Sequence, residues 1–306
     1  MKNNVKADRW LPVRLKLLEW SYVFMSFLFN LRANLKPGVG VSKEKRDVRI
    51  IVSLTSIKER LSVIHICLES ILSQKVKPDK VILWLSHEDN NGKRILEESL
   101  LPRKLLRLKK AGLEIRFCRN VRSYRKLFFT LKEYPNDIII TTDDDVIYPP
   151  DWLKNMLESY KKNPRCVHFY RGRLMKMTDE GKLGNYKTWE LYDRTKEPSL
   201  LLIPTGKDGV LYPPGSLNEE VFNERAFNEL CPYQDDIWFK AMTLLNNVLC
   251  QRVRPDHDDF KSIVGSQTTT LYRDNTANND MAVRNVFEKY NLYRRLPAFG
   301  ERLDKC

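Results

Sequence analysis

The stretch 138–152, IIITTDDDVIYPPDW, decides how this sequence is expected to fold. Its three consecutive isoleucines, Ile138 to Ile140, are typical of a strand that is buried on both faces. Three aspartates follow at once, and a pair of prolines then precedes a helix that is expected to begin near Asp151. The sequence therefore predicts a core strand whose carboxyl end carries a cluster of negative charge.

Asp143, Asp144 and Asp145 repel one another, and they begin at the mouth of an apolar strand, where loss of hydration is costly. Such a cluster is stable if a cation lies among the carboxylates, and a hard divalent ion such as Mn2+ or Mg2+ prefers oxygen ligands. Because side chains alternate along a strand, Asp143 and Asp145 are expected to point one way and Asp144 the other. A solvated acidic turn is the alternative, and the buried strand before it argues against that interpretation.

The composition, with 42% hydrophobic and 30% charged residues, is that of an ordinary globular protein, and a chain of 306 residues can hold one large α/β domain or two small ones. The formal net charge of +14 indicates an anionic partner. No RNA-recognition signature or zinc finger occurs, so we do not expect nucleic acid to be the anionic partner. The six cysteines contain no CxxC pair and predict buried, reduced thiols.

Residues 1–40 differ from the rest of the chain. Basic residues precede the aromatic-rich run 17–31, and Arg32 and Lys36 follow it. Glu19 interrupts the run, which is shorter than the about 20 apolar residues of a transmembrane helix, and no signal-peptide cleavage site follows. We expect an amphipathic helix on an anionic membrane surface. Packing on the protein's own core or on a partner subunit is the alternative.

Strands and helices alternate over the next hundred residues. Apolar runs predict strands at 49–54, 80–85, 113–118 and from 138 onward. A capping box formed by Ser56 and Glu59 is expected to start the first helix, and the charged segment 92–110 is expected to be helical. This order implies a mostly parallel sheet with helices on both faces, and ligands bind such sheets beyond the carboxyl ends of the strands. The polar residues that follow predicted strand ends are Thr55, Ser56, Arg60, Arg122, Lys126 and the three aspartates.

Neither GxGxxG nor GxxxxGK[ST] occurs, which argues against a dinucleotide dehydrogenase or a P-loop NTPase. A bound phosphate would have to be held by a metal and by basic side chains. For Arg60, Arg122 and Lys126 taken singly, a solvated basic face is an equally good interpretation.

Together these features resemble the glycosyltransferases of the GT-A fold, close to the inverting, DxD-containing family 2 group. The resemblance covers about 48–260 and implies a Rossmann-like α/β fold with a central, mostly parallel sheet flanked by helices. It is carried by the strand that ends in Leu-Thr-Ser and by the segments KPDKVILWLS (77–86), TTDDDVIYPPDWL (141–153), GVLYPPG (209–215) and CPYQDDIWF (231–239).

The resemblance implies roles for the residues at the strand ends. Thr55, Ser56 and Arg60 would line the nucleoside pocket, and Lys126 would lie near the base or the phosphates. Asp144 would meet the ribose of a nucleotide-diphospho-sugar.

The metal would be Mn2+ or Mg2+, bound by Asp145. Asp143 is a further candidate, for the metal as well as for the nucleotide-sugar. His257, in the segment RPDHDD (254–259), is another candidate ligand because some GT-A enzymes complete the metal shell with a histidine near the C-terminus. A surface histidine among acids is the alternative.

Asp235 and Asp236 are the candidates for the catalytic carboxylates. Two adjacent carboxylates can raise one pKa into the range that suits proton abstraction, whereas a helix N-terminus favours the ionised form. The motif match favours Asp236 as the base and Asp235 as its orienting neighbour, and a pair that only caps the helix is the alternative. A single base opposite the leaving group implies inversion at the anomeric carbon.

The expected organisation has three parts: the helix of residues 1–40, a GT-A domain at 41–296 and a basic tail at 297–306. Within the domain, 206–215 is too rich in Gly and Pro for regular structure and is expected to be a loop bordering the acceptor. The polar segment 265–280 is expected to order over the donor.

These observations favour a metal-dependent inverting glycosyltransferase of hexosyltransferase type. It would act on a glycan or lipid-linked acceptor in surface polysaccharide biosynthesis, at the cytoplasmic face of the plasma membrane. A sugar-nucleotidyltransferase is one alternative, but it normally needs a Gly-rich loop where Thr55-Ser56-Ile57 stands. A non-catalytic, membrane-associated sugar-nucleotide-binding protein is the other.

Overall fold

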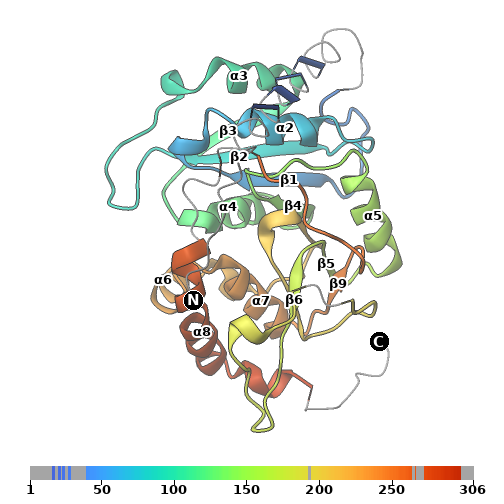
Figure 1. Ribbon diagram of the computed structural model, residues 1–306, viewed down its shortest axis with the longest axis vertical. Helices are drawn as coiled ribbons and strands as arrows, with labels where there is room; N and C mark the ends of the chain where they lie inside the picture. Colours follow the sequence, from blue (N-terminus) through green and yellow to red (C-terminus); the bar gives the residue numbers. More distant parts are fainter. Residues whose placement is uncertain are drawn as a thin grey trace, which may run out of the picture.

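A computed structural model describes residues 16–17, 20–21, 23–24, 27–28, 39–191, 194–263, 266 and 272–297. A seven-stranded sheet, in the order β3-β2-β1-β4-β8-β5-β9, runs through the middle of the molecule (Figure 1). Helices cover both of its faces, and β6 and β7 form a separate two-stranded sheet. The α/β class and the mostly parallel central sheet predicted from the sequence are confirmed.

Four strands form the parallel half of the sheet. They are β1 (Ile50–Thr55), β2 (Lys80–Ser86), β3 (Leu113–Cys118) and β4 (Ile138–Thr142). In the pairing of β1 with β4, Leu54 lies opposite Thr142. The residues that follow these two strands therefore emerge side by side, which places the Thr55–Ser56 turn next to the aspartate run.

The other half contains the antiparallel strand β8 (Val210–Tyr212), which lies between β4 and β5 (Val167–Phe169). This strand corrects the expectation of an irregular loop at 206–215. Its three residues are buried between two neighbouring strands, and the Gly and Pro residues only mark its ends. The remaining strands are β6 (Gly172–Leu174), β7 (Leu202–Pro204) and β9 (Cys250–Arg252).

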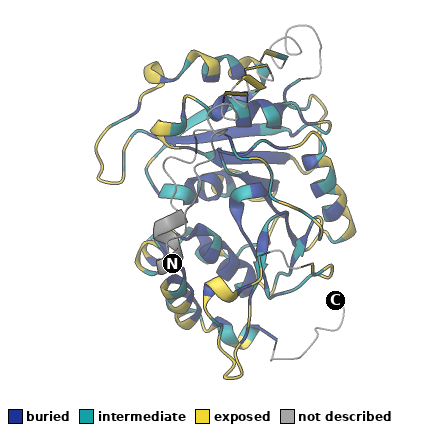
Figure 2. Cartoon of the chain, viewed as in Figure 1, coloured by how far each residue is buried: buried dark blue, intermediate teal, exposed yellow. Residues whose placement is uncertain are grey.

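The two faces of the sheet bury different side chains. Val52 and Leu54 of β1 pack with the helices of one face, whereas Ile51 points to the opposite side. Figure 2 shows the strands as the most continuously buried part of the chain. The helices are α2 (Ile64–Leu72), α3 (Arg103–Leu106), α4 (Arg125–Glu133), α5 (Trp152–Lys162), α6 (Glu224–Leu230), α7 (Asp235–Leu245) and α8 (Tyr272–Lys289).

Short 3-10 helices connect these elements. They are η1 (Lys58–Arg60), η2 (Glu98–Leu100), η3 (Arg107–Ala111), η4 (Arg122–Tyr124), η5 (Tyr186–Thr188), η6 (Gly206–Asp208), η7 (Glu219–Phe222) and η9 (Leu292–Arg295). The expected helix at 92–110 is confirmed only in part: helical structure begins at Glu98 and is interrupted at Leu101, which is extended because it precedes Pro102.

Two expected helix caps are not formed. The capping box of Ser56 and Glu59 is absent because the Ser56 hydroxyl binds Asp144, and α2 begins only at Ile64. Asp151 stands at the N-cap position of α5, but its carboxylate pairs with Lys75 instead of a backbone N–H.

The described residues between 16 and 28 are helical. Within the described ranges, no helix is both long and apolar enough to cross a membrane. Most of the segment 1–40, most of the predicted tail 297–306 and parts of 265–280 lie outside the described residues. All five described cysteines are free thiols, as predicted.

Candidate active site

Asp144 lies at the edge where β1 and β4 end. The Ser56 hydroxyl donates a hydrogen bond to its Oδ2, and Arg60 Nη1 donates to its Oδ1 at 2.6 Å. The same guanidinium nitrogen lies 3.4 Å from Asp145 Oδ2. Burial raises the pKa of Asp144, while Arg60 and Ser56 oppose the rise. Arg60 therefore acts as the cation that joins two of the three aspartates.

Asp143 points to a different partner. Its Oδ1 lies 2.9 Å from the ammonium of Lys126, in the first turn of α4. The expected pairing of Asp143 with Asp145 on one side is therefore not observed. The reason is that β4 ends at Thr142 and the next residues turn, so the alternation of a strand does not extend to them.

Tyr148 links the aspartate run to η6. Its buried hydroxyl accepts a hydrogen bond from the Asp143 N–H at 3.1 Å and donates to the Lys207 carbonyl at 3.0 Å. Trp152 Nε1 donates to the next carbonyl of the same turn, that of Asp208, at 2.9 Å. Two side chains that follow the aspartates thus fix the position of η6.

Asp235 and Asp236, the first two residues of α7, reach the aspartate run through Lys126 and Gly206. Lys126 Nζ lies 3.1 Å from Asp235 Oδ2, and the Gly206 N–H donates to Asp236 Oδ1 at 3.1 Å. A Cβ on Gly206 would lie 3.2 Å from Asp143 Oδ1 and 3.5 Å from Asp236 Oδ1. Two motifs about ninety residues apart in the sequence thus meet around one glycine.

The half-buried Asp236 has an unusual acidity. Burial, and then repulsion from Asp235, raise its pKa to about 7, although the nearby Lys126 opposes the rise. Burial alone would lower the pKa of Lys126, but Asp143, Asp235 and Asp236 together raise it, so the lysine stays charged. A carboxylate that titrates near neutral pH is well suited to general-base catalysis.

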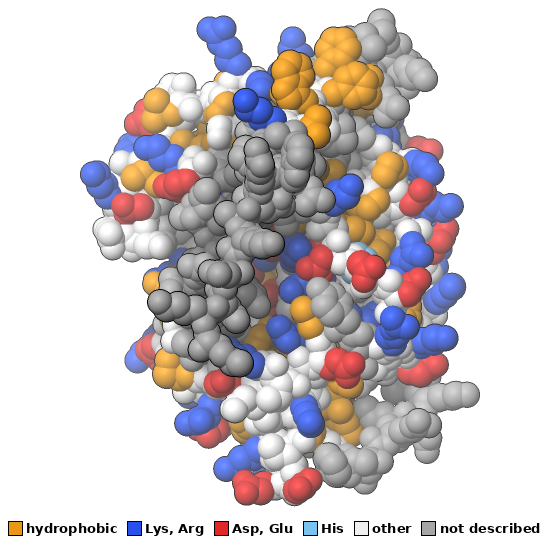
Figure 3. Space-filling model, in the orientation of Figure 1, with side chains coloured by type: hydrophobic (Ala, Val, Ile, Leu, Met, Phe, Trp, Pro, Cys, Tyr) orange, Lys and Arg blue, Asp and Glu red, His pale blue; other side chains and the backbone are white. Residues whose placement is uncertain are grey.

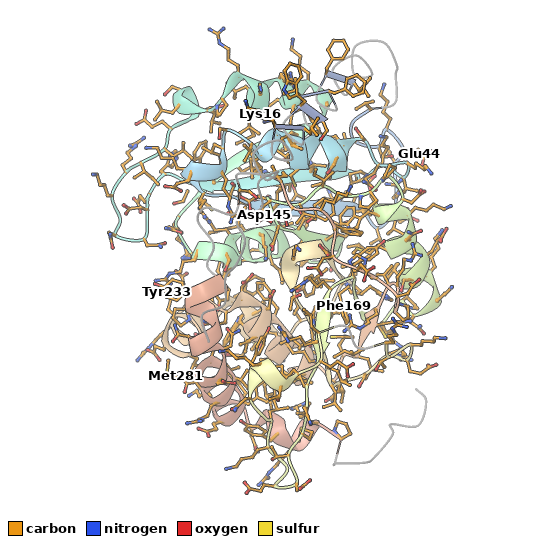
Figure 4. The ribbon with its side chains drawn as sticks, viewed as in Figure 1. Lys16, Glu44, Asp145, Phe169, Tyr233 and Met281 are labelled. Atoms are coloured by element: carbon orange, nitrogen blue, oxygen red, sulfur yellow. The ribbon has the colours of Figure 1, made fainter. Side chains whose placement is uncertain are left out.

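Not all of the predicted residues join this cluster. The Thr55 hydroxyl donates to the Trp84 carbonyl at 2.9 Å, at the end of β1. The Arg122 guanidinium lies over the ring of Tyr233, which Figure 4 shows well apart from Asp145. Arg122 also donates to Asn228 and so belongs to the contacts of α6.

His257 binds the last residue of η6. Its Nε2 is 2.7 Å from Asp208 Oδ2, a fully buried carboxylate, and its ring borders a surface cavity of about 340 Å³. In the part of the chain that the structure describes, no three His, Cys, Asp or Glu side chains are grouped so as to hold a metal ion by themselves. The oxygen donors at 143–145 suit a hard cation, and such an ion would need further ligands from a bound substrate.

Tyr148 and Gly206 belong to the candidate site but were not predicted from the sequence. Tyr148 stands inside the segment that carries the aspartates, so its place in the motif was visible but its partner in η6 was not. Gly206 has no positive φ, and what requires a glycine is the 2.6 Å that a Cβ would leave to Lys126 Nζ. This close approach can be seen only in three dimensions.

The fold gathers carboxylates at the carboxyl edge of a mostly parallel sheet, which is where α/β enzymes of this kind bind their ligands. The model of glycosyl transferase family 2 matches residues 54–209, which is about half of the chain. The protein therefore belongs to this family. The matched region contains the aspartate run, Lys126 and Gly206, and it ends before the Asp235–Asp236 pair.

A search of curated proteins finds no match. Among solved structures, the chain is similar to the mannosyltransferase PcManGT from Pyrobaculum calidifontis in complex with GDP-Man and Mn2+, with 14% identity, a TM-score of 0.48, and coverage of 90% of this chain and 74% of that one. It is also similar to a 4-diphosphocytidyl-2C-methyl-D-erythritol synthase, with 11% identity, a TM-score of 0.42, and coverage of 78% and 99%.

Proposed function

We propose that this family 2 glycosyltransferase moves a hexose from a nucleotide-diphospho-sugar to a hydroxyl group of a glycan or lipid-linked acceptor, with inversion. The observation that supports the proposal most is the meeting of the Asp143–Asp145 run with Asp236 around Gly206. Asp236, the carboxyl group opposite the run, has a pKa raised to about 7. Transfer needs carboxylates that bind the donor and a base within reach of one sugar ring, and this arrangement would supply both.

On the donor side, Thr55, Ser56 and Arg60 would bind the nucleoside together with Asp143 and Asp144. Lys126 was expected beside the nucleobase or the phosphates, and its contacts with Asp143 and Asp235 suggest another role.

Asp145 would hold Mn2+ or Mg2+, and Asp143 would join it while its Oδ1 stays bonded to Lys126. When bound, the ion would supply a Lewis acid that stabilises the departing diphosphate. His257 could join only by giving up its hydrogen bond to Asp208.

On the acceptor side, Asp236 would take the proton of the attacking hydroxyl. The acceptor oxygen then forms a bond to the anomeric carbon, and the nucleoside diphosphate leaves with the electron pair of the bond that breaks. Asp235 would hold its neighbour in place. Because one base acts from the side opposite the leaving group, the configuration is inverted.

The proposal also places the enzyme at the cytoplasmic face of the plasma membrane. The helical residues near the N-terminus expose Leu17, Trp20, Phe24 and Phe27, all more than half accessible to solvent. Exposed aromatic side chains gather with basic ones at the top of Figure 3. Residues 1–36 carry seven Lys or Arg and two Asp or Glu. Apolar side chains flanked by positive charge suit an anionic lipid surface.

The membrane proposal is tested with vesicles that contain phosphatidylglycerol. Replacement of Trp20, Phe24 and Phe27 by serine should abolish sedimentation with these vesicles and leave the melting temperature unchanged. Serine at the exposed residues Leu100 and Met281 is the matched control and should bind as wild type. A triple variant that unfolds would favour packing of this segment on the protein.

The catalytic proposal is tested with a panel of UDP-, GDP- and dTDP-sugars, with and without Mn2+. We expect at least one donor to raise the melting temperature in a Mn2+-dependent way and to release its nucleoside diphosphate. Asp145→Asn should lose both effects. If no donor stabilises the wild type and the variant behaves identically, the proposal is wrong.

The family match favours this function over a sugar-nucleotidyltransferase. The first strand is followed by Thr55 and Ser56, which bind neighbouring protein groups, and not by the Gly-rich loop that such an enzyme uses. The candidate carboxylates are all present, which also argues against a non-catalytic binding protein.

A further inference from the structure

Lys126 is buried, with only 5% of its surface exposed, and its ammonium lies between the two carboxylate motifs. We propose that Lys126 is a positioning residue that holds the candidate base through Asp235, instead of a ligand of the donor phosphates. The inference rests on the proposed function, because it assigns a role within that reaction.

The contacts of the ammonium support this role. Lys126 Nζ is 2.9 Å from Asp143 Oδ1 and 3.1 Å from Asp235 Oδ2. These contacts use two of the three N–H donors of the ammonium, and a move of the lysine towards a phosphate would break them. Breaking a buried ion pair by removing one partner typically costs about 3–5 kcal/mol, because the other charge stays buried.

The position of the Asp235 side chain depends on Lys126. Within the described residues, its Oδ2 accepts no hydrogen bond apart from the ion pair with Lys126. The side chain is buried, with 8% exposed, so water offers little compensation. Lys126 therefore determines where the first residue of α7 lies.

The lysine itself is held by the core of the molecule. It follows Arg125 at the start of α4, which packs against β1 and β4, and the next two residues, Leu127 and Phe128, are buried in the hydrophobic core. Its ammonium is therefore fixed relative to the strand that ends in the aspartate run. Through Lys126, the position of α7 is set with respect to that run.

The position of Asp236 follows from the position of Asp235. It is the neighbour of Asp235 on α7, and its Oδ1 receives the Gly206 N–H at 3.1 Å. Without the ammonium, Asp143, Asp235 and Asp236 would face one another with no cation between them, and their repulsion would turn the base away from the acceptor. The proposal thus predicts a defect in turnover and not in donor binding.

The test is Lys126→Met, compared with Lys132→Met at an exposed position of the same helix. We expect Lys126→Met to lower kcat by about 100-fold, as for a misplacement of about 1 Å. The Kd of the nucleoside diphosphate in the presence of Mn2+ should change less than twofold. Lys132→Met should match wild type in both measurements. A loss of nucleotide affinity with kcat retained, or an unchanged kcat, overturns the inference.

A second variant keeps the test decisive if Lys126→Met does not fold. Asp235→Asn keeps the lysine and its bond to Asp143, and it should lower kcat to a similar extent. The double variant should be no slower than the slower single variant, because both act on the same link. Additive losses would contradict the proposal. A wild-type protein without transfer activity overturns the proposed function as well, whereas a fully active Lys126→Met overturns only this inference.

Discussion

The aspartate run and the start of α7 meet at Gly206, and their carboxylates are compensated by different groups. On one side, Asp144 and Asp145 share the guanidinium of Arg60. On the other side, Asp236 receives a backbone N–H, and the ammonium nearest to it is bonded to other aspartates. The comparison shows how similar residues can take different roles: the first group keeps a cation in direct contact, whereas Asp236 can change its protonation near pH 7.

The largest effect is expected when the candidate base, Asp236, is removed. Asp236→Asn should lower kcat by about 10²–10⁴-fold, the usual contribution of a general base, and leave nucleotide binding intact, because the donor side is unchanged. Transfer assays and calorimetric titration with nucleoside diphosphate measure the two effects. Asp256→Asn, an exposed carboxylate, is the control. Equal losses in kcat and in nucleotide affinity would show that the two groups do not work separately.

Gly206→Ala should be the next largest effect. The new Cβ would lie 2.6 Å from Lys126 Nζ, so the ammonium has to move away from Asp143 and Asp235. We expect kcat to fall by about 100-fold and the free energy of unfolding to fall by about 1–3 kcal/mol. Gly184→Ala is the matched control, because the atom nearest to its Cβ would be 3.5 Å away. A fully active Gly206→Ala would exclude the close packing described here.

The pH dependence of kcat/KM tests the raised pKa of Asp236. In the proposed mechanism the deprotonated form of Asp236 is the base, and its pKa is about 7, so the rate should rise about tenfold per pH unit below this value and then level off. Ser56→Ala, on the donor side, should keep the same midpoint. A rate that is constant from pH 5 to 8 would contradict the assignment of the base.

The raised pKa of Asp236 also affects stability. The carboxyl group has an ordinary pKa of 3.8 and one of about 7 when folded, so between these values the folded state binds more protons than the unfolded state. Its contribution to stability is therefore largest at low pH and is lost as the pH rises through 7. Asp236→Asn removes this loss, and its melting temperature relative to wild type should increase between pH 5 and pH 8.

The smallest expected effect is that of Ser56→Ala. The change removes one hydrogen bond to Asp144 and leaves Arg60 in place. We expect a loss of about 1 kcal/mol in nucleotide binding, which is about fivefold in Kd, with kcat unchanged. A large fall in kcat would place Ser56 in the chemistry of transfer and weaken the division between the two sides.

The parallel half of the sheet could be predicted from the sequence because its strands are long, buried apolar runs. The aspartate run could also be located, since it directly follows the run that starts at Ile138. The strand β8 could not be predicted, because three residues are too few to show a period and the flanking Gly and Pro residues resemble a loop.

The contacts within the candidate site could not be predicted for a different reason. Lys126 meets Asp235 from 109 positions away, and a single sequence carries no signal of such a pairing. The failed capping box shows the same limit. Ser56 has suitable spacing to Glu59, but a buried carboxylate from another strand is the stronger acceptor.

The hydroxyl of Tyr148 has a consequence for protein engineering. It is hydrogen-bonded both to the backbone of Asp143 and to the carbonyl of Lys207, so the segments at 143–148 and 205–209 form a single unit. A chimera that takes one of these segments from a relative would therefore have to take the other as well. Exchange of the pair together would keep both hydrogen bonds of the tyrosine.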